Sequence, residues 1–538
     1  MTISRRTLFQ GAFAGAATPS LPSPARAQEE CPTGSATERR KWRRGVEGQR
    51  KADLGDGSYL NPIVPGDHPD PTILKDGKDY YMTFSSFESY PGITIWHSRD
   101  LVTWMPVVSA LQKYIGSVWA LDLVKYAGRY FVYIPAIAEG RGFKIYAIWA
   151  DKIEGPWSDP VDLGIDDCID PGHVVGEDGK RYLFVNGIRK VPLTNDGLKA
   201  AGPVEHAYSP WRYPEDWVVE AFAPEGPKLL RHGDYFYLVT AVGGTAGPPT
   251  GHMIIAARSR SVHGPWEHCP HNPIIKTYSP AEPWWSRGHG TPVEGPSGDW
   301  WIVYHAYENG YRTLGRQTIL EPIEWTADGW FRAKGGDLSV PLDKPKGGAA
   351  VLSGIALSDN FTGGRLGLQW SFHAPDPSQL QRARYGPAGL WIEGAGTTPA
   401  DSPPLTCTPG DRAYEAEVSI KLDGQAEGGL LLFYSPKAYV GVGFDGAHVK
   451  TFAQAEEQPW MRRQISARTL RLKVTNDHQI VTFRYSTDGG ESWQLVDLRM
   501  EVSGINHNVF GGFLSLKPAI YAAGKGRIQL RDFNYRAL

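Results

Sequence analysis

The sequence is poor in cysteine and contains no cysteine pairing motif. Its 538 residues include four cysteines, Cys31, Cys168, Cys269 and Cys407. Zinc sites and dithiol redox sites need cysteines at short spacing, such as C-x-x-C, so neither kind of site is indicated. We expect free, buried thiols rather than a disulfide framework.

An excess of charge and long hydrophobic runs are also missing. The formal net charge is −2, whereas a protein that binds nucleic acid needs a basic face. After the N-terminal segment, no stretch approaches the roughly 18 apolar residues of a membrane span. We therefore expect no nucleic-acid partner and no membrane-embedded part, and the length favours two or three domains.

Aromatic residues, glycine and proline are abundant instead. The chain has 19 Trp, 25 Tyr, 62 Gly and 42 Pro. Many rings suit β-rich cores, and frequent Gly and Pro indicate many tight turns. The composition favours an all-β chain, and its rings also suit surfaces that bind sugars.

The N-terminus has the pattern of an export signal. Arg5 and Arg6 are followed by the apolar run GAFAGAA and by an A-x-A triplet that ends at Ala27, the order found in twin-arginine signal peptides. We expect residues 1–27 to be a signal peptide and the mature protein to be periplasmic or secreted. Residues 28–57 are polar and rich in Lys and Arg, which predicts a basic linker.

A glycine between two aromatic-rich segments recurs along residues 58–345. The five glycines are Gly77, Gly128, Gly179, Gly233 and Gly298. Their spacings are 51, 51, 54 and 65 residues. Each copy predicts a β-hairpin, and four-stranded units of about 50 residues describe the blades of a β-propeller. A β-sandwich would not explain the near-constant period, so we predict a five-bladed propeller over this range.

One polar residue precedes each predicted hairpin, at the start of the first strand of its blade. These residues are Asp70, Asp122, Asp170, Glu225 and His289. The first strands of a propeller surround its axis, so we expect these side chains to converge at one end of that axis. Gathering carboxylates in a partly desolvated site raises their pKa values and is costly. The cluster therefore indicates acid–base chemistry.

Hydrolysis of a glycosidic bond is a reaction that such a cluster suits. One carboxylic acid protonates the leaving oxygen, and a second carboxylate acts on the other face of the sugar. A third acid beside the proton donor raises the pKa of the donor and keeps it protonated near neutral pH.

The motifs HPDPT, IDPG, PEGP and GHGTP, followed by YRTLGRQ, resemble those of glycoside hydrolase family 43. Its members are five-bladed propellers that cleave xylose- and arabinose-containing plant polysaccharides. The resemblance covers residues 60–345 and implies that Asp70 is the general base, Glu225 the general acid and Asp170 the residue that orients the acid and tunes its pKa. The implied reaction is single-step hydrolysis with inversion and requires no cofactor.

The same resemblance implies substrate-binding residues. Phe87 and Trp119 resemble sugar-stacking aromatics, and Asp122, His289 and Arg316 resemble polar residues at the base of the pocket. In the family this histidine is often linked to a central metal ion or water cluster, so His289 is a candidate metal ligand and a structural Ca²⁺ on the axis is an open alternative. The alternative is a structural role: Phe87 and Trp119 as core aromatics, His289 as a core histidine, and Arg316 as the partner of a structural acid.

Residues 346–538 lack the aromatic repeat. Their alternating strands, with turns about every 8–12 residues, predict an antiparallel β-sandwich. The segment resembles the concanavalin-like jelly roll attached to many xylosidase-type members of the family. There a loop of the sandwich can close one side of the pocket; a carbohydrate-binding or purely stabilising role is the alternative.

These predictions describe an exo-acting hydrolase that removes terminal xylose or arabinofuranose from plant-derived oligosaccharides by inversion. β-Xylosidase and α-L-arabinofuranosidase activities share the scaffold and the acids, so the sequence does not separate them. A galactan-directed hydrolase and a non-catalytic carbohydrate-binding propeller are the alternatives. The oligomeric state is not indicated.

Overall fold

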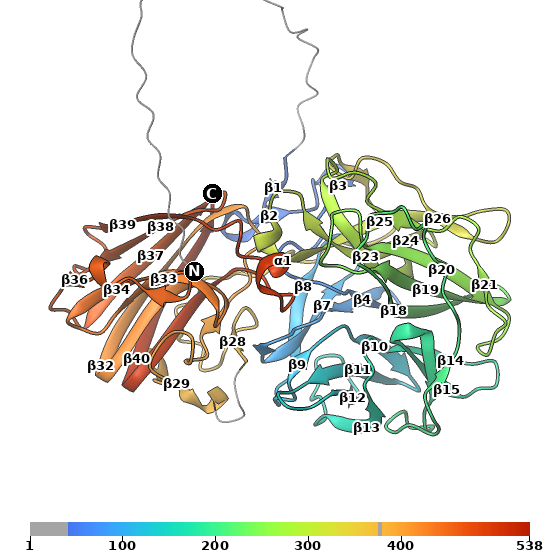
Figure 1. Cartoon of the computed structure of the whole chain (residues 1–538), viewed down its shortest axis with the longest axis horizontal. Helices are drawn as coiled ribbons and strands as arrows, with labels where there is room; N and C mark the ends of the chain where they lie inside the picture. The colour runs from blue at the N-terminus through green and yellow to red at the C-terminus, as the bar shows by residue number, and fades with distance from the viewer. Residues whose placement is uncertain (1–40, 375–378) are drawn as a thin grey trace, which may run out of the picture. The chain divides into compact units, whose positions relative to one another are not determined.

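The computed structural model describes residues 41–374 and 379–538, and β-strands make up most of it (Figure 1). The expected signal peptide, residues 1–27, lies outside the described residues, as does the first part of the expected linker. Each strand below carries the label it has in Figure 1.

Five antiparallel sheets follow one another along the chain, each with a path of four strands. Blade one contains β4 (Thr72–Asp76), β5 (Asp79–Thr83), β7 (Gly92–Ser98) and β8 (Met105–Leu111). Blade two contains β10 (Asp122–Tyr126), β11 (Arg129–Ile137), β12 (Phe143–Ala150) and β13 (Val161–Asp166), with β9 (Ser117–Val118) paired to β11. Blade three contains β14 (Gly172–Val175), β15 (Arg181–Val185), β16 (Arg189–Pro192) and β17 (Glu205–His206). Blade four contains β18 (Ala221–His232), β19 (Tyr235–Gly243), β20 (Met253–Ser259) and β21 (Glu267–His268), with β22 (Ile275–Lys276) paired to β20. Blade five contains β23 (Trp284–Glu294), β24 (Trp300–Glu308), β25 (Arg316–Trp325) and β26 (Phe331–Ala333).

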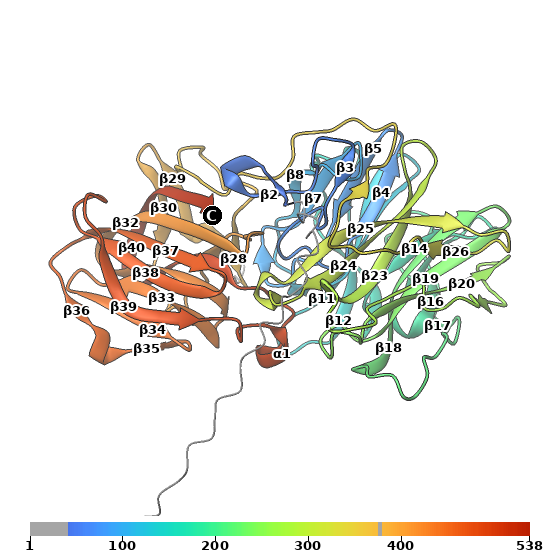
Figure 2. The ribbon, with the colours of Figure 1, turned by 90° about the horizontal axis from the view of Figure 1, so that it is seen from above.

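The first strands of the five blades form a closed ring. In order around it, β4, β10, β14, β18 and β23 are neighbours, and β23 returns to β4. In every blade the first two strands meet at the predicted glycine, which has φ between 58° and 88°, as tight hairpins require. The predicted five-bladed propeller is confirmed, and Figure 2 shows the same strands from a second direction.

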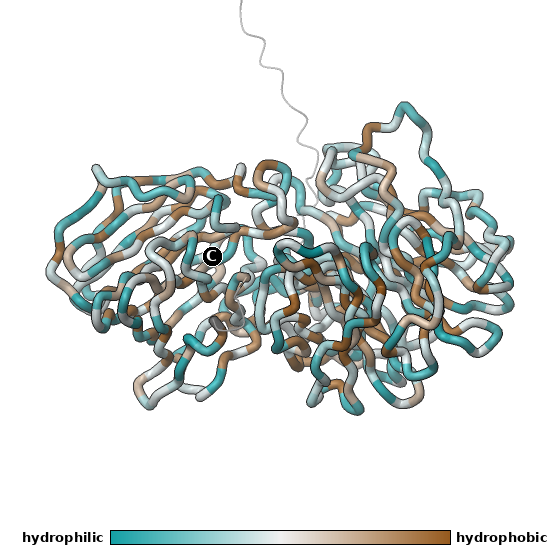
Figure 3. The backbone as a smooth tube through the Cα atoms, turned by 60° about the horizontal axis from the view of Figure 1, so that its bottom comes forward, coloured by the Kyte–Doolittle hydropathy of each residue, from teal (hydrophilic) through white to brown (hydrophobic). Residues whose placement is uncertain are grey.

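Aromatic side chains fill the space between blades. Tyr80, Trp96 and Trp104 of blade one form one buried cluster with Trp301 and Val303 of blade five. Because each blade packs against a neighbour on both faces, its strands do not show a simple alternation of apolar and polar residues. Figure 3 shows short hydrophobic and hydrophilic stretches alternating along the backbone.

Segments before and after the blades pair with each other. β3 (Ser58–Tyr59) is hydrogen-bonded to β27 (Leu342–Asp343), and Val64 forms a bridge with Thr318 of β25. The first described strands, β1 (Arg43–Arg44) and β2 (Arg50–Lys51), form a short ladder of their own. The segment directly before blade one thus helps to close the propeller ring.

Residues 41–57 are folded against the two domains, which differs from the predicted linker. Arg50 donates to Glu308 Oε2 at 3.0 Å, to Gln317 Oε1 at 2.8 Å and, through Nε, to the carbonyl of Gly410 at 2.7 Å. Its side chain is only 6% exposed. A basic composition predicted exposure, but this charge is paired with the propeller and the sandwich and is therefore buried.

The predicted C-terminal β-sandwich is confirmed. Its centre is formed by two long antiparallel strands, β32 (Ala413–Ser435) and β40 (Lys517–Ala537). The first half of β32 also pairs with β37, and its second half pairs with β33. The other elements are β28 (Ser371–His373), β29 (Ala383–Gly386), β30 (Gly389–Glu393), β31 (Leu405–Thr406), β33 (Ala438–Phe444), β34 (His448–Ala453), β35 (Glu456–Glu457), β36 (Arg463–Gln464), β37 (Thr469–Asp477), β38 (Ile480–Ser486), β39 (Gln494–Glu501) and the helix α1 (His507–Phe510).

A strand of the propeller joins the two domains. β6 (Ser89–Tyr90), which follows β5 of blade one, pairs with β28 of the sandwich. Among the described cysteines, Cys168, Cys269 and Cys407 are buried and free, as expected. Within the described ranges no helix has the length and hydrophobicity needed to span a membrane.

Candidate active site

A small pocket of about 40 Å³ lies where the first strands of the blades begin. Seven of the eight predicted site residues line it, namely Asp70, Phe87, Trp119, Asp170, Glu225, His289 and Arg316. Thr245, which follows β19, and Phe513, from the sandwich, also belong to its wall. The structure therefore brings together side chains from both domains around the three predicted catalytic acids.

Backbone conformation aims several of these side chains at the pocket. Asp70, Asp170 and His289 have φ values of 55°, 58° and 58°, in the left-handed region. This region is unfavourable for residues other than glycine, and such strain gathers at functional sites. Glu225 reaches the pocket differently, through register shifts in β18 on both sides of it. Bulges of this kind redirect a side chain out of the regular pleat.

Asp70 is buried and held as a carboxylate. Its Oδ1 accepts from Arg316 Nη1 at 2.8 Å and lies 2.9 Å from His305 Nδ1, and its Oδ2 accepts from Ser85 Oγ at 2.5 Å. Burial alone would raise the pKa of Asp70, but the positive charge of Arg316 holds that pKa well below its usual value. Burial lowers the pKa of both histidines, so they are neutral. Arg316 is therefore the charge that keeps Asp70 ionised.

Glu225 and Asp170 have the opposite tendency. Burial, followed by the negative charges of Asp170 and Asp70, raises the pKa of Glu225 well above its usual value. Burial and Asp70 raise the pKa of Asp170 to about 7, although Gly226 N–H donates to its Oδ2 at 2.9 Å. The Glu225 side chain is still 22% exposed. A proton is thus retained near neutral pH beside an ionised carboxylate.

Aromatic rings form one wall of the pocket. The rings of Phe87 and Phe513 are nearly parallel, with centroids 6.2 Å apart, and Trp119 stands edge-on to Phe513 at 5.3 Å. The Arg316 guanidinium lies 5.6 Å from the Phe87 ring centroid and 5.3 Å from that of Phe513. Phe87 and Trp119 therefore line the pocket, their stacking on a sugar stays a prediction, and the sandwich supplies a third ring.

Asp122 is not in the pocket wall, which corrects its predicted place. Its Oδ1 accepts from Thr72 Oγ1 at 2.9 Å and from Lys228 Nζ at 2.7 Å, and its Oδ2 accepts from the backbone N–H of His173 at 2.7 Å. These residues belong to β4, β18 and β14. The Asp122 carboxylate therefore connects four inner strands through its hydrogen bonds, which gives it a structural role outside the pocket wall.

His289 lies in the pocket wall, but its surroundings do not suit calcium. Its Nδ1 is 3.5 Å from Asp70 Oδ1, and its buried Nε2 has no hydrogen-bond partner among the described residues. Calcium takes about six to eight oxygen ligands, whereas this ring offers a single nitrogen. In the described part of the chain, no three His, Cys, Asp or Glu side chains are grouped to hold a metal ion.

Sequence reasoning missed several residues around the pocket. They are Ser85, Lys228, Thr245, His252, His305 and Phe513. None begins the first strand of a blade, so the search for one polar residue per repeat could not find them. Phe513 is the furthest removed, because it comes from the other domain.

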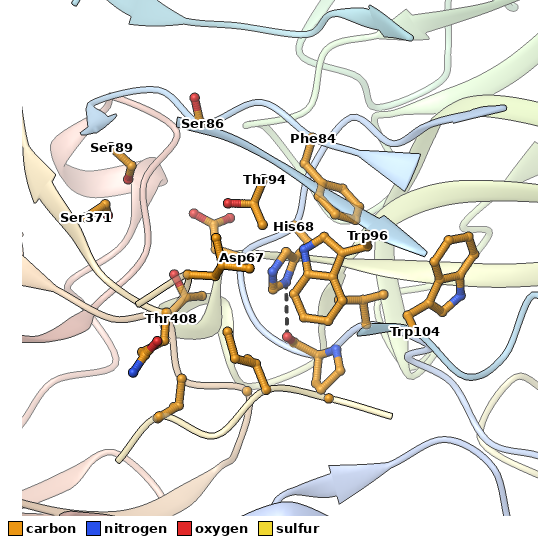
Figure 4. A pocket seen from close by; sticks show the side chains of 18 of the residues that line it. Asp67, His68, Phe84, Ser86, Ser89, Thr94, Trp96, Trp104, Ser371 and Thr408 are labelled. Carbon is orange, nitrogen blue, oxygen red and sulfur yellow. Dashed lines mark hydrogen bonds between the residues drawn. The ribbon is translucent and has the colours of Figure 1, made fainter. Parts of the chain in front are cut away.

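A larger cavity of about 140 Å³ lies between blade one and the sandwich (Figure 4). Among the described residues that line it, Asp67 is the one with a carboxylate, and its Oδ1 accepts the backbone N–H of Arg316 at 3.2 Å. His68 hydrogen-bonds to the carbonyl of Pro65 at 3.1 Å, as the dashed line in Figure 4 shows. Without a second acid this cavity cannot perform paired acid–base chemistry, and the smaller pocket is the better reaction site.

Comparison with protein families agrees with the two-domain fold. The family described as "Glycosyl hydrolases family 43" matches residues 59–331. The family described as "Beta xylosidase C-terminal Concanavalin A-like domain" matches residues 358–535.

Individual relatives match as well. A non-reducing end α-L-arabinofuranosidase of Bacteroides ovatus is 31% identical in an alignment of 377 residues that covers 65% of this chain and 68% of that protein. A xylan 1,3-β-xylosidase of a Vibrio species is 32% identical in an alignment of 328 residues that covers 53% of this chain and 59% of that enzyme. The crystal structure of a family 43 protein from Bacillus licheniformis superposes with a TM-score of 0.79 at 27% identity, over 89% of this chain and all of that one.

Proposed function

The chain belongs to glycoside hydrolase family 43, and from this premise we propose that it removes terminal xylose or arabinofuranose residues from plant-derived oligosaccharides, with inversion of configuration. One observation supports the proposal most: a single pocket places an ionised carboxylate, Asp70, among the same walls as a carboxyl group, Glu225, that retains its proton. Glycoside hydrolysis needs this pair of opposite protonation states.

In the proposed reaction, Glu225 protonates the glycosidic oxygen while Asp70 accepts a proton from the attacking water. The water oxygen bonds to the anomeric carbon as the bond to the leaving oxygen breaks, so the reaction takes one step and inverts the configuration. Asp170 keeps the pKa of Glu225 high, and Arg316 keeps Asp70 ionised. This chemistry requires no cofactor.

Phe513 supports exo-action. Its ring stands against Phe87 and Trp119 in the pocket wall, so the sandwich narrows the space around the acids. A pocket with one side walled by the sandwich suits one terminal sugar better than the interior of a long chain. We therefore assign the sandwich a pocket-closing role rather than a separate carbohydrate-binding role.

Whether the terminal sugar is xylose or arabinofuranose is decided by the assay described below. The named relatives include an arabinofuranosidase and a xylosidase, and both activities can use the same three acids. Galactan-directed hydrolysis is the alternative within the fold, and a non-catalytic carbohydrate-binding propeller is the alternative outside it.

The direct test is turnover of aryl β-D-xylopyranoside and aryl α-L-arabinofuranoside, measured side by side. Proton NMR of the first-formed sugar should show the inverted anomer. Retention of configuration would contradict the proposed single step, and binding of oligosaccharide without turnover would favour the non-catalytic alternative.

We also propose that the protein is exported by the twin-arginine route, on the pattern around Arg5 and Arg6. Replacing both arginines with lysine should leave the full-length precursor in the cytoplasm, as cell fractionation would show. Unchanged export of the variant would contradict the proposal.

A further inference from the structure

We propose that His252 is a positioning residue for the general acid, holding one oxygen of Glu225 so that the other faces the glycosidic oxygen. The inference rests on the proposed function, because it concerns a step of that reaction. No motif of the sequence pointed to this histidine.

His252 lies directly before β20 and is fully buried. Its Nε2 is 3.8 Å from Glu225 Oε1. Neither ring nitrogen has a hydrogen-bond partner among the described residues. Because an unpaired buried polar atom is costly, a buried imidazole of this kind needs an explanation. A role toward the neighbouring carboxyl group supplies one.

The packing around His252 leaves its ring little freedom. A Cβ atom at Gly288 would lie 1.3 Å from His252 Cδ2 and 2.0 Å from its Nε2, so only glycine at 288 admits the ring. The ring of His305 lies at a centroid distance of 5.2 Å. These contacts hold the Nε2 edge near Glu225.

Glu225 needs such a partner more than the other two acids do. Asp70 is anchored by Arg316 and Ser85, and Asp170 is anchored by the backbone N–H of Gly226. No described residue donates a hydrogen bond to the Glu225 carboxyl group. The Nε2 atom of His252 lies 3.8 Å from Glu225 Oε1. A general acid must nevertheless be held within hydrogen-bond reach of the atom it protonates.

A small rotation of the Glu225 side chain would bring Oε1 to hydrogen-bond distance from Nε2. With Nε2–H donating to Oε1, the acidic proton resides on the other oxygen, which faces the substrate. When Glu225 gives up that proton it becomes a carboxylate, and a hydrogen bond to a charged acceptor is stronger. The same contact therefore favours the proton transfer. Burial lowers the pKa of His252 well below its usual value, which agrees with a neutral ring that positions without exchanging protons.

The test compares leaving groups. His252→Phe keeps a ring but removes both nitrogens, and His252→Gln keeps an N–H donor. For aryl glycosides of the sugar that the wild type cleaves, His252→Phe should lose about 10- to 100-fold in kcat/KM with poor leaving groups, a part of the ~10²–10⁴-fold that a general acid supplies. With the best leaving groups, which need little protonation, the loss should stay below about 3-fold. His252→Gln should recover most of the activity.

A uniform loss across the leaving groups, or no loss, would overturn the proposal, since a structural role does not depend on the leaving group. Gly288→Ala, which displaces the ring without removing its nitrogens, should reproduce the leaving-group dependence and decides the question if His252→Phe does not fold. His97→Phe is the matched control; His97 pairs with Asp79 in blade one and should leave the series unchanged. Failure of the proposed function is distinguishable, because the wild type would then cleave no member of the series.

Discussion

Arg316 Nη1 donates to Asp70 Oδ1 at 2.8 Å, although 246 residues separate the two in the chain. Asp70 precedes the first strand of blade one, and Arg316 begins the third strand of blade five. Closure of the propeller ring is what brings them together. The charge that keeps the proposed base ionised thus depends on the first and last blades being neighbours.

Replacing Arg316 with glutamine should shift the acid limb of activity. Asp70 must be ionised to act as a base, so activity is lost as the pH falls through its pKa. Arg316 lowers that pKa, and removing this opposite charge should raise it. The acid limb of the kcat/KM profile should therefore move to higher pH. Arg332→Gln is the control, because Arg332 forms an exposed pair with Glu324 in the same blade. If Arg316→Gln left the acid limb of the kcat/KM profile at the same pH, Arg316 would not be the group that keeps Asp70 ionised.

Removing the two acids should have different consequences. Glu225→Ala should lose roughly 10²–10⁴-fold in kcat on oligosaccharides but much less on aryl glycosides with good leaving groups, which depart without a proton. Asp70→Ala should lose activity on both, because water must be activated in either case. Steady-state kinetics on the paired substrates checks this. If the two variants showed the same substrate dependence, the assignment of acid and base would be wrong.

Phe513→Ala should open the pocket from the side of the sandwich. We expect KM for the terminal sugar to rise about 10-fold, which corresponds to about 1.4 kcal/mol of lost binding, with a smaller change in kcat. Phe510→Ala is the matched control, since Phe510 is 44% exposed and lies outside the pocket wall. Equal KM values for the two variants would show that the sandwich does not close the site.

Arg50→Ala should destabilise the whole fold. When Arg50 is removed, the buried Glu308 carboxylate loses part of its compensating positive charge, and breaking a buried ion pair costs about 3–5 kcal/mol. Because Glu308 keeps its contact with Arg412, we expect a loss of stability at the lower end of this range. Urea denaturation measures it. Arg129→Ala removes an exposed pair with Asp151 and should cost less than about 1 kcal/mol. An equally small loss for Arg50→Ala would mean that residues 41–57 do not stabilise the protein.

The propeller could be predicted because each of its repeats depends on residues that are close together in the sequence. Each hairpin requires a glycine with positive φ at its turn, and each pair of blades requires aromatic residues between them. Asp70, Asp170 and Glu225 were found because each lies seven to nine residues before such a turn, and the family resemblance then supplied their expected roles. Asp122 was predicted to line the pocket because it lies at the equivalent position of blade two. Its carboxylate instead binds residues of the neighbouring inner strands.

The sequence by itself determined the all-β class, the five blades, the change of domain and the three acids, because hydrophobic pattern, turn chemistry and motif spacing act over short distances. Only the tertiary structure decided which groups stand around those acids. A sequence motif indicated Arg316, but its ion pair with Asp70 forms only because blades one and five meet. Phe513 reaches the pocket from the other domain, and His252 lies beside Glu225 only in the folded blade four. The pKa values of Asp70 and Glu225 follow from those neighbours, since burial and charge act through space and not along the chain.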